Sequence, residues 1–329
     1  RSTPLYSSAA SDVYKRQAIN HAMDEELEFN DKMLVFGQDV AGGKGGVFTA
    51  TKGLTDKYGE DRVFNSPLAE SSIIGTAIGL ATLGYKPVVE IQFGDYIWTG
   101  MMQIRNELAT MNYRSKGDWQ CPVVVRVPVG GYIHGSLCHS QSIDGFFTHL
   151  PGIMIAYPSN AADAKGLLKM ACRMNDPVLF MEHKGLYRQS YAATEEPNKD
   201  YLLPFGIANY VKEGDELTIV CWGAMVQKSI DAVNDLGLED GLIEIIDIRT
   251  LNPIDYETIE ESIRKTGKIL IVYEDNITNG PGAEICSIVS DRYFDLLDGP
   301  VRRIASKDSP IPYNWYLEEK VLIQTADIA

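Results

Sequence analysis

One carboxylate, Glu70, stands in a sequence setting where it could act on a ligand. It precedes the small-residue apolar run IIGTAIGLA, residues 73–81, which would let another backbone or subunit approach closely and desolvate the acid. Burial raises the pKa of a carboxyl, so Glu70 could then share its proton with a ligand nitrogen. The alternative is an acid that complements the dipole in the first helical turn, with Ser66 as the cap and Pro67 at the first position. Position alone leaves both interpretations open.

Two histidines lie in a loop of unusual composition, GGYIHGSLCHSQSIDGFF, which spans residues 130–147. A lone histidine is usually structural, but His134 and His139 stand among Gly and Ser just after an apolar strand. They lack a third ligand at metal spacing, which argues against zinc. A proton-transfer role suits His139, because the unperturbed pKa of histidine is near neutral pH. For His134, shaping the loop is the simpler interpretation.

Other catalytic patterns are missing from the chain. The glycine loop AGGKGGVF, residues 41–48, does not have the GxxxxGK[ST] spacing of a phosphate loop, and a mobile glycine loop at a contact is the better interpretation. There is no GxSxG elbow, and none of the five cysteines is placed as a nucleophile. The side chains of this sequence alone make a poor catalyst, so a cofactor is implied.

Alternating helices and strands must position these residues. From residue 18 the pattern predicts an α/β fold with two parallel-sheet domains: a first domain at 18–190, a linker at 191–204 and a second domain at 205–329. Several strands are continuous apolar runs, which indicates sheets covered on both faces. We expect a helix after Pro67, a long helix over 95–113 and a strand at 242–250. Glu70, Tyr96 and His139 fall near strand-to-loop junctions, where parallel sheets bind ligands.

Composition excludes several classes of protein. A chain of 329 residues is long enough for two domains, and its net charge of −15 argues against a nucleic-acid partner. Five scattered cysteines without CxxC spacing indicate free thiols in a reducing compartment. No apolar run is long enough to span a membrane. Residues 1–17 have no periodicity, no signal-peptide pattern and no initiator Met, so we expect a non-native or disordered end there.

Four segments, PLAESSIIGTAIGLA, EIQFGDYIW, RVPVGGYIHGSLCHSQS and DSPIPYNWYLEE, resemble one family in the same order. This is the beta subunit of the thiamine-diphosphate-dependent 2-oxo acid dehydrogenases, the decarboxylating first component of the pyruvate and branched-chain complexes. The resemblance covers residue 18 to the end. It implies a transketolase-like pyrimidine-binding domain followed by a transketolase C-terminal domain.

The resemblance also implies roles for individual residues. Glu70 matches the glutamate that hydrogen-bonds the aminopyrimidine ring nitrogen of thiamine diphosphate, and Tyr96 matches the aromatic residue that stacks on that ring. Leu68 is implied to touch the cofactor by packing. His139 matches the histidine implicated in acyl transfer to lipoyl. A structural potassium ion is a further implication, near the helix ending ACRMND, where Cys172, Asn175 and Asp176 lie.

One motif of thiamine enzymes is missing: the chain has no GDG followed by an Asn-rich stretch that would hold magnesium and the diphosphate. The resemblance therefore implies a separate alpha subunit that holds most of the magnesium site, with two alpha and two beta chains sharing the active sites. The apolar surface around the helix that follows Glu70 is the expected interface. A lipoyl-bearing transacylase is the second implied partner, and neither nucleic acid nor a membrane is expected.

The implied reaction is oxidative decarboxylation of a 2-oxo acid with acyl transfer to lipoyl. The HSQSxxxFF run favours a branched-chain substrate such as 3-methyl-2-oxobutanoate, with a pyruvate or acetoin dehydrogenase beta subunit as the alternative. Half of a transketolase or deoxyxylulose-phosphate synthase, and a non-catalytic scaffold, are weaker alternatives. The implied location is the bacterial cytoplasm, or the mitochondrial matrix for a eukaryotic chain.

Overall fold

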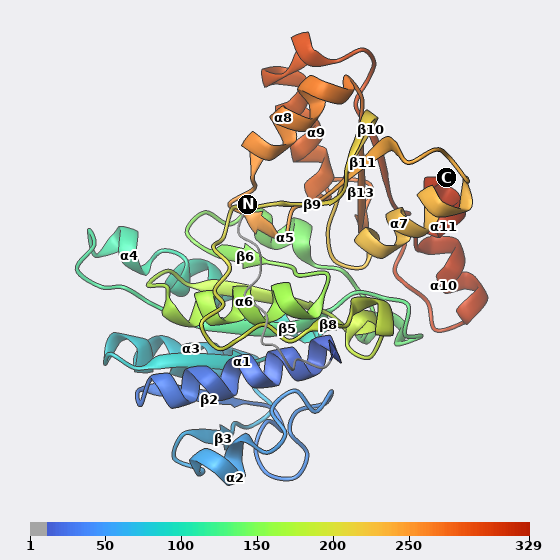
Figure 1. Cartoon of the computed structure of the whole chain (residues 1–329). Coiled ribbons are helices and arrows are strands. Elements are labelled where there is room, and N and C mark those ends of the chain that lie inside the picture. The colour runs from blue at the N-terminus through green and yellow to red at the C-terminus, as the bar shows by residue number, and fades with distance from the viewer. Residues whose placement is uncertain (1–11) are drawn as a thin grey trace.

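A computed structural model describes residues 12–329, which form two lobes that are each built on a β-sheet (Figure 1). The expectation for residues 1–11 lies outside the described residues. Strands and helices alternate along both lobes, and most strand pairs are parallel. The predicted α/β class with two parallel-sheet domains is therefore confirmed.

The first sheet has seven strands, and six of them are parallel. Its order is β12 (Thr250–Asn252), β6 (Met154–Ala156), β7 (Val178–His183), β5 (Val124–Val129), β4 (Lys86–Glu90), β2 (Met33–Gly37) and β3 (Val63–Asn65). Strands β4, β5 and β7, at the centre of the order, are buried at every residue. Their continuous apolar runs arise because both faces of the sheet are covered.

Helices cover the two faces of this sheet, because successive strand residues point to opposite sides. Leu34 and Phe36 join the core under α3 (Glu70–Thr82). Met33 and Val35 join the core under α1 (Lys15–Phe29) and α6 (Ala161–Arg173). Helices α1 and α6 lie side by side across one face of the sheet (Figure 1). The shorter helices of this lobe are α2 (Leu54–Tyr58), α4 (Met111–Arg114) and α5 (Asp144–Thr148).

The segment predicted as one long helix over 95–113 is helical but irregular. It begins as a 3-10 helix at Gly94–Gly100, becomes a π-helix at Gln103–Leu108 and ends as α4. The prediction of a continuous α-helix was wrong because apolar spacing does not distinguish these tighter and wider turns. Such turns are frequent at functional sites, and this one follows the carboxyl end of β4.

The second sheet has five strands, in the order β14 (Arg302–Ser306), β13 (Ile269–Asn276), β10 (Gly214–Cys221), β11 (Gly241–Asp247) and β9 (Asn209–Lys212). Only the edge strand β9 runs antiparallel among these described pairs. The helices of this lobe are α7 (Met225–Asp235), α8 (Tyr256–Thr266), α9 (Pro281–Arg292), α10 (Trp315–Val321) and α11 (Thr325–Ile328).

The strand predicted at 242–250 divides between the two sheets. It leaves the second sheet after Asp247, turns at Arg249 with a φ of 59°, and enters the first sheet as β12. There β12 pairs antiparallel with β6. The apolar run LIEIIDIRT contains no glycine or proline, so the sequence offered no sign of this change of sheet.

Residues 12–17 belong to the fold even though they lack periodicity. Strand β1 (Asp12–Val13) pairs with β8 (Thr194–Glu195), which lies within the segment expected to be a linker. Lys15, fully buried at the start of α1, donates a 2.7 Å hydrogen bond from Nζ to the carbonyl of Pro158. Burial lowers the pKa of Lys15 to about 8. These contacts attach the start of the described chain to the first lobe.

Candidate functional site

Glu70 is the first residue of α3, and Ala69 is its cap residue. The prediction that Ser66 caps this helix, with Pro67 as its first residue, was wrong. The amide of Ser66 donates to the carbonyl of Gly37 on β2 at 2.8 Å, and the amide of Ala69 donates to the carbonyl of Pro67 at 2.8 Å. These bonds keep 66–69 out of the helix. The carboxylate therefore stands at the helix N-terminus, where the dipole favours negative charge.

Two polar side chains hold the Glu70 carboxylate. Gln38 donates from Nε2 to Oε1 at 2.7 Å, and Thr99 donates from Oγ1 to Oε2 at 2.8 Å. Burial disfavours the charge, but the bonds from Gln38, the Glu70 amide and Thr99 outweigh it, so the pKa of Glu70 lies below its usual range. Glu70 is only partly buried in the single chain, and the raised pKa expected for a carboxylate covered by another subunit stays a prediction. Its carboxylate is ionised, and it can accept a further hydrogen bond.

Tyr96 lies on the 3-10 helix that follows β4, three residues before Thr99. The Thr99 hydroxyl is 3.3 Å from the carbonyl of Tyr96 and also contacts Glu70, so a single turn connects the two predicted site residues. Burial, followed by Cys138, Asp95 and Glu70, raises the pKa of Tyr96. The Tyr96 hydroxyl therefore keeps its proton and acts as a donor.

His139 contacts Tyr96 directly, with Nε2 2.7 Å from the tyrosine hydroxyl. Its other nitrogen, Nδ1, is 3.1 Å from the carbonyl of Gly135. A carbonyl only accepts, so Nδ1 carries the proton and Nε2 accepts from Tyr96. The ring of Phe93 packs edge-on against both, at centroid distances of 4.5 Å from His139 and 5.5 Å from Tyr96. These contacts fix the tautomer and the orientation of the imidazole.

The loop that carries His139 has a strained backbone. Tyr132, His134 and Ser136 have φ values of 61°, 56° and 65°, which non-glycine residues rarely adopt. His134 is exposed, and its Nδ1 contacts the carboxylate of Glu318 on α10. The His134 amide also donates to Glu318 Oε1 at 3.3 Å. His134 thus attaches the loop to the second lobe.

A buried contact between the lobes supports the start of the same loop. Gly185 donates its amide to Nδ1 of His183 at 3.1 Å, so the other nitrogen, Nε2, donates to Glu274 Oε2 at 2.6 Å. Glu274, on β13, also accepts the amide of Gly131 at 2.5 Å. Burial opposes its charge, but His183, the Gly131 amide and Lys184 hold the pKa of Glu274 below its usual range. A carboxylate of the second lobe therefore fixes the loop of the first.

Leu68 is 77% exposed and lies two residues before Glu70. Other large apolar side chains are exposed on the segments that carry Tyr96 and His139: Trp98, Met102, Leu137 and Phe146. The side of the site that these residues line therefore faces outward in the single chain. Such apolar surface is typical of an interaction site.

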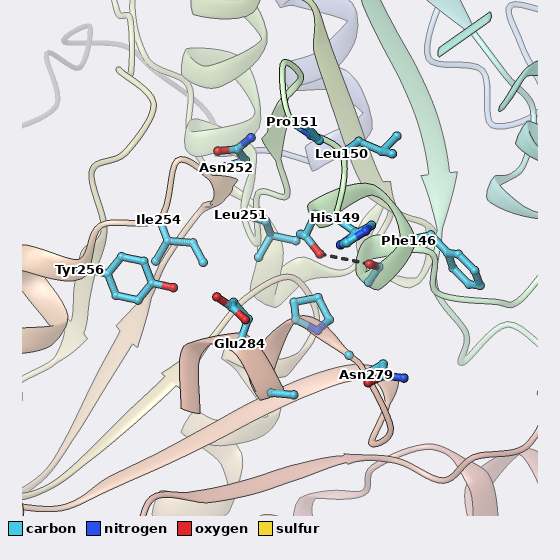
Figure 2. Close-up of a pocket in the computed structure, with 15 residues that line it drawn as sticks. Phe146, His149, Leu150, Pro151, Leu251, Asn252, Ile254, Tyr256, Asn279 and Glu284 are labelled. Atoms are coloured by element: carbon cyan, nitrogen blue, oxygen red, sulfur yellow. Dashed lines mark hydrogen bonds between the residues drawn. The ribbon is translucent and has the colours of Figure 1, made fainter. Parts of the chain in front are cut away.

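A cavity of about 380 Å³ adjoins Tyr96, and its lining includes Cys138, Gln141, Asp275 and Ile311. A larger cavity of about 900 Å³ does not include Glu70, Tyr96 or His139 in its lining. Figure 2 shows it between Ile254 and Tyr256 on one side and His149 and Phe146 on the other. Of the three predicted site residues, the smaller cavity includes only Tyr96 in its lining, so cavity size alone does not select the place where Glu70, Tyr96 and His139 meet.

The remaining candidates lie elsewhere. In the glycine loop 41–48, a Cβ on Gly46 would lie 2.8 Å from Glu90 Oε1, so glycine is needed there for close packing. Cys172, Asn175 and Asp176 lie at the carboxyl end of α6. Within residues 12–329, no group of three or more His, Cys, Asp and Glu side chains could hold a metal ion. None of the described helices is long and apolar enough to cross a bilayer.

Sequence reasoning missed Gln38, Thr99 and Phe93. Gln38 directly follows strand β2, as ligand-contacting residues in parallel sheets commonly do, so its position was the available signal. Thr99 meets Glu70 only because the chain turns as a 3-10 helix, which the sequence does not reveal.

Comparison with family models divides the chain into two matching segments. Residues 12–190 match the transketolase pyrimidine-binding domain, and residues 206–328 match the transketolase C-terminal domain. A solved structure described as an inactive beta4 tetramer of a split-gene transketolase superposes with a TM-score of 0.77. It covers 96% of both chains at 24% identity, which indicates a shared fold.

Curated relatives are more similar in sequence. The 2-oxoisovalerate dehydrogenase subunit beta of Bacillus subtilis is 45% identical over 307 residues, which cover 93% of both chains. Its mitochondrial counterpart from Dictyostelium discoideum is 46% identical over 90% of this chain and 80% of its own length. The pyruvate dehydrogenase E1 component subunit beta of Bacillus subtilis is 41% identical over 94% of this chain and 96% of its own length.

Proposed function

The chain belongs to the beta subunits of the decarboxylating first component of 2-oxo acid dehydrogenase complexes, and we propose that Glu70, Tyr96 and His139 form its share of a thiamine diphosphate site. The observation that carries the proposal is the continuous contact between them: Glu70 to Thr99, Thr99 to Tyr96, and Tyr96 to His139. An acid, an aromatic ring and an imidazole thus share one edge of the first sheet.

The residues present fit the pyrimidine half of this cofactor. Glu70 is ionised, partly exposed and held in place by Gln38 and Thr99, so it can accept a hydrogen bond from a protonated ring nitrogen. Tyr96 and Leu68 provide apolar surface on the segments next to it. When bound, thiamine diphosphate supplies the carbon nucleophile that attacks the 2-oxo group. The role of Glu70 is to accept a hydrogen bond from the aminopyrimidine ring nitrogen and so keep that nitrogen protonated, which this activation needs.

His139 is placed to move a proton during acyl transfer. The Tyr96 hydroxyl and the Phe93 ring orient its imidazole. An imidazole with a free nitrogen can take a proton and return it later in the cycle. We therefore assign His139 to transfer of the acyl group to the lipoyl group of a transacylase.

The second part of the site belongs to an alpha subunit. Family membership implies that partner, and the missing GDG motif supports assigning the diphosphate and magnesium to it. The exposed side chains of Leu68, Trp98 and Met102 lie on the segments that carry Glu70 and Tyr96 and fit an apolar contact. We propose that the alpha subunit covers Glu70 through this surface in an assembly of two alpha and two beta chains.

A branched-chain 2-oxo acid is the proposed substrate. Two relatives named for 2-oxoisovalerate are 45% and 46% identical, against 41% for the Bacillus subtilis relative named for pyruvate. Pyruvate and acetoin remain the alternatives, because part of the substrate pocket lies on the partner chain.

The experiment is co-expression with the alpha chain, followed by decarboxylation assays on a panel of 2-oxo acids with an artificial electron acceptor. We expect the highest kcat/KM with 3-methyl-2-oxobutanoate. A preference for pyruvate would reassign the substrate, and absence of turnover with every 2-oxo acid would overturn the proposed activity.

A further inference from the structure

A buried lysine lies at the carboxyl end of α6, where the family resemblance placed a potassium ion. Lys86, the first residue of β4, is 6% exposed, and its Nζ donates a 2.9 Å hydrogen bond to the carbonyl of Met174. Met174 is the residue that ends α6, between Cys172 and the pair Asn175–Asp176. The cationic side chain of Lys86 is therefore fixed among the residues expected near the ion.

The electrostatics of a helix end explain why a cation is favoured at this place. The last carbonyls of a helix have no partner within it and carry the negative end of its dipole. A monovalent cation coordinated by carbonyl oxygens would satisfy them, and so does an ammonium group. Lys86 already occupies one such oxygen, and a second monovalent cation beside it would meet the repulsion of like charges.

Two acids, Asp176 and Glu26, act on Lys86, and the exposed Asp176 carboxylate supplies one negative charge that the ammonium group of Lys86 balances. Cys121 and Cys172 are buried near Lys86, and they offer thiols rather than carboxylates. Glu26 is neutralised by Arg173, whose Nη2 lies 2.8 Å from Glu26 Oε1. Burial lowers the pKa of Lys86 to about 8, which leaves its ammonium charged at neutral pH.

We propose that the ammonium group of Lys86 takes the place of a monovalent cation at the carboxyl end of α6, so that the fold of this subunit does not depend on potassium. The residues predicted near the ion do not fit a potassium ion in this chain, because the covalently attached ammonium group of Lys86 already supplies the positive charge at this place. The site lies at the amino end of β4, whereas Tyr96 follows its carboxyl end, so Lys86 is separate from the proposed catalytic edge.

The test is thermal unfolding of the full chain in potassium, sodium and choline chloride at equal ionic strength. Wild-type protein should give the same Tm in all three salts. Lys86→Met should lower Tm by a few degrees in choline, and potassium should restore part of that loss. Lys86→Arg, which keeps a fixed cation, should show no potassium response. Lys32→Met is the matched control, because Lys32 is an exposed lysine that lines the same cavity, of about 440 Å³, as Lys86 and Met174.

Three outcomes would overturn the proposal: stabilisation of the wild-type chain by potassium alone, an unchanged Tm for Lys86→Met in choline, or a lowered Tm that potassium does not restore. If Lys86→Met does not fold, the wild-type chain still provides the test. It is exchanged into rubidium, passed through a desalting column and analysed by mass spectrometry. Substoichiometric rubidium supports the proposal, and one retained ion per chain contradicts it.

Discussion

The hydroxyl group of Tyr96 donates a 2.7 Å hydrogen bond to Nε2 of His139, which connects the helix after β4 with the loop after β5. Because Nδ1 of the same ring donates to Gly135, both nitrogens of the resting imidazole already have partners. His139 must exchange Tyr96 for its reaction partner when it acts. Variants that remove either the tyrosine hydroxyl or the imidazole can therefore distinguish the contributions of the two residues.

Glu70→Ala should abolish decarboxylation in the assembled enzyme, with a loss of at least about 10²–10⁴-fold in kcat, the range expected for removal of a proton-transfer group. Assembly with the alpha chain should be intact, because the Glu70 carboxylate contributes no apolar packing. Initial rates with an artificial electron acceptor and gel filtration measure the two quantities. Glu60→Ala is the control, since Glu60 is an exposed acid. Near-normal turnover in Glu70→Ala would exclude the assigned role.

His139→Ala should reduce the overall reaction of the complex more than it reduces decarboxylation with an artificial acceptor. The reason is that acyl transfer to lipoyl needs the imidazole, whereas release of carbon dioxide depends on Glu70 and the cofactor. The ratio of the two rates is the measurement. His149→Ala, which alters an exposed histidine in the larger cavity, should leave that ratio unchanged. Equal losses in both assays would indicate a structural role for His139.

Tyr96→Phe keeps the aromatic ring and removes only the hydrogen bond to His139. One uncharged hydrogen bond contributes about 0.5–1.5 kcal/mol, so we expect a loss of roughly 2- to 10-fold in the overall reaction. Decarboxylation alone should change less, because Phe retains the ring surface. A large loss in decarboxylation would instead assign the hydroxyl to the earlier step.

Asp144 and Asp275 lie close together where α5 contacts the second lobe, and we expect them to share one proton. Asp275 accepts the amides of Gly145 and Asn276, so Asp144 is the protonated partner, and Trp222 donates to its second oxygen at 3.0 Å. Burial, followed by the charge of Asp275, raises the pKa of Asp144 well above its ordinary value of 3.8. Its contribution to stability is present below that ordinary value and is lost as pH rises through the folded-state pKa.

Asp144→Asn should therefore remove this pH-dependent loss, because an amide can donate to Asp275 and accept from Trp222 without ionising. The difference in Tm between variant and wild type should grow in favour of the variant as pH rises above 4, which thermal scans across pH would measure. Asp235→Asn, at an exposed position on α7, should follow the wild-type profile. Parallel profiles for Asp144→Asn and wild type would show that the pair does not share a proton.

Arg126→Met should destabilise the first lobe. The guanidinium is 1% exposed and bonds to Glu182 at 2.7 and 2.9 Å and to Glu90 at 2.8 Å. Removing it leaves two carboxylates buried without their cation, which costs about 3–5 kcal/mol. A lower Tm for Arg126→Met than for Arg302→Met, an exposed control, is the expected result. An unchanged Tm would mean that the two acids become protonated without cost.

The sequence was sufficient to predict the two α/β units, because continuous apolar strands and alternating helices are local patterns. It also selected Glu70, Tyr96 and His139, which the fold brings to one edge as expected for residues after parallel strands. Their roles remain predictions. Contacts between distant segments were not predictable: Gln38 and Thr99 reach Glu70 only through the register of β2 with β4 and through a 3-10 turn.

Two further features of the structure were not predictable from the sequence for the same reason. The Lys86–Met174 contact spans 88 residues, and nothing in either local segment indicates it. The change of sheet after Asp247 also depends on a partner strand, β6, that lies about 90 residues earlier in the chain. In both cases contact with a segment distant in the sequence decides the conformation, and local propensity does not include that contact.

Strand β12 has a consequence for attempts to express the two lobes as separate fragments. It follows the second lobe's β11 in the chain but pairs with β6 in the first sheet. A fragment that stops at residue 204 would lack this strand and expose the hydrogen-bonding groups of β6, which invites edge-to-edge aggregation. The complementary fragment would carry an unpaired segment. Two co-expressed fragments of this chain should therefore overlap in sequence rather than be divided at the linker.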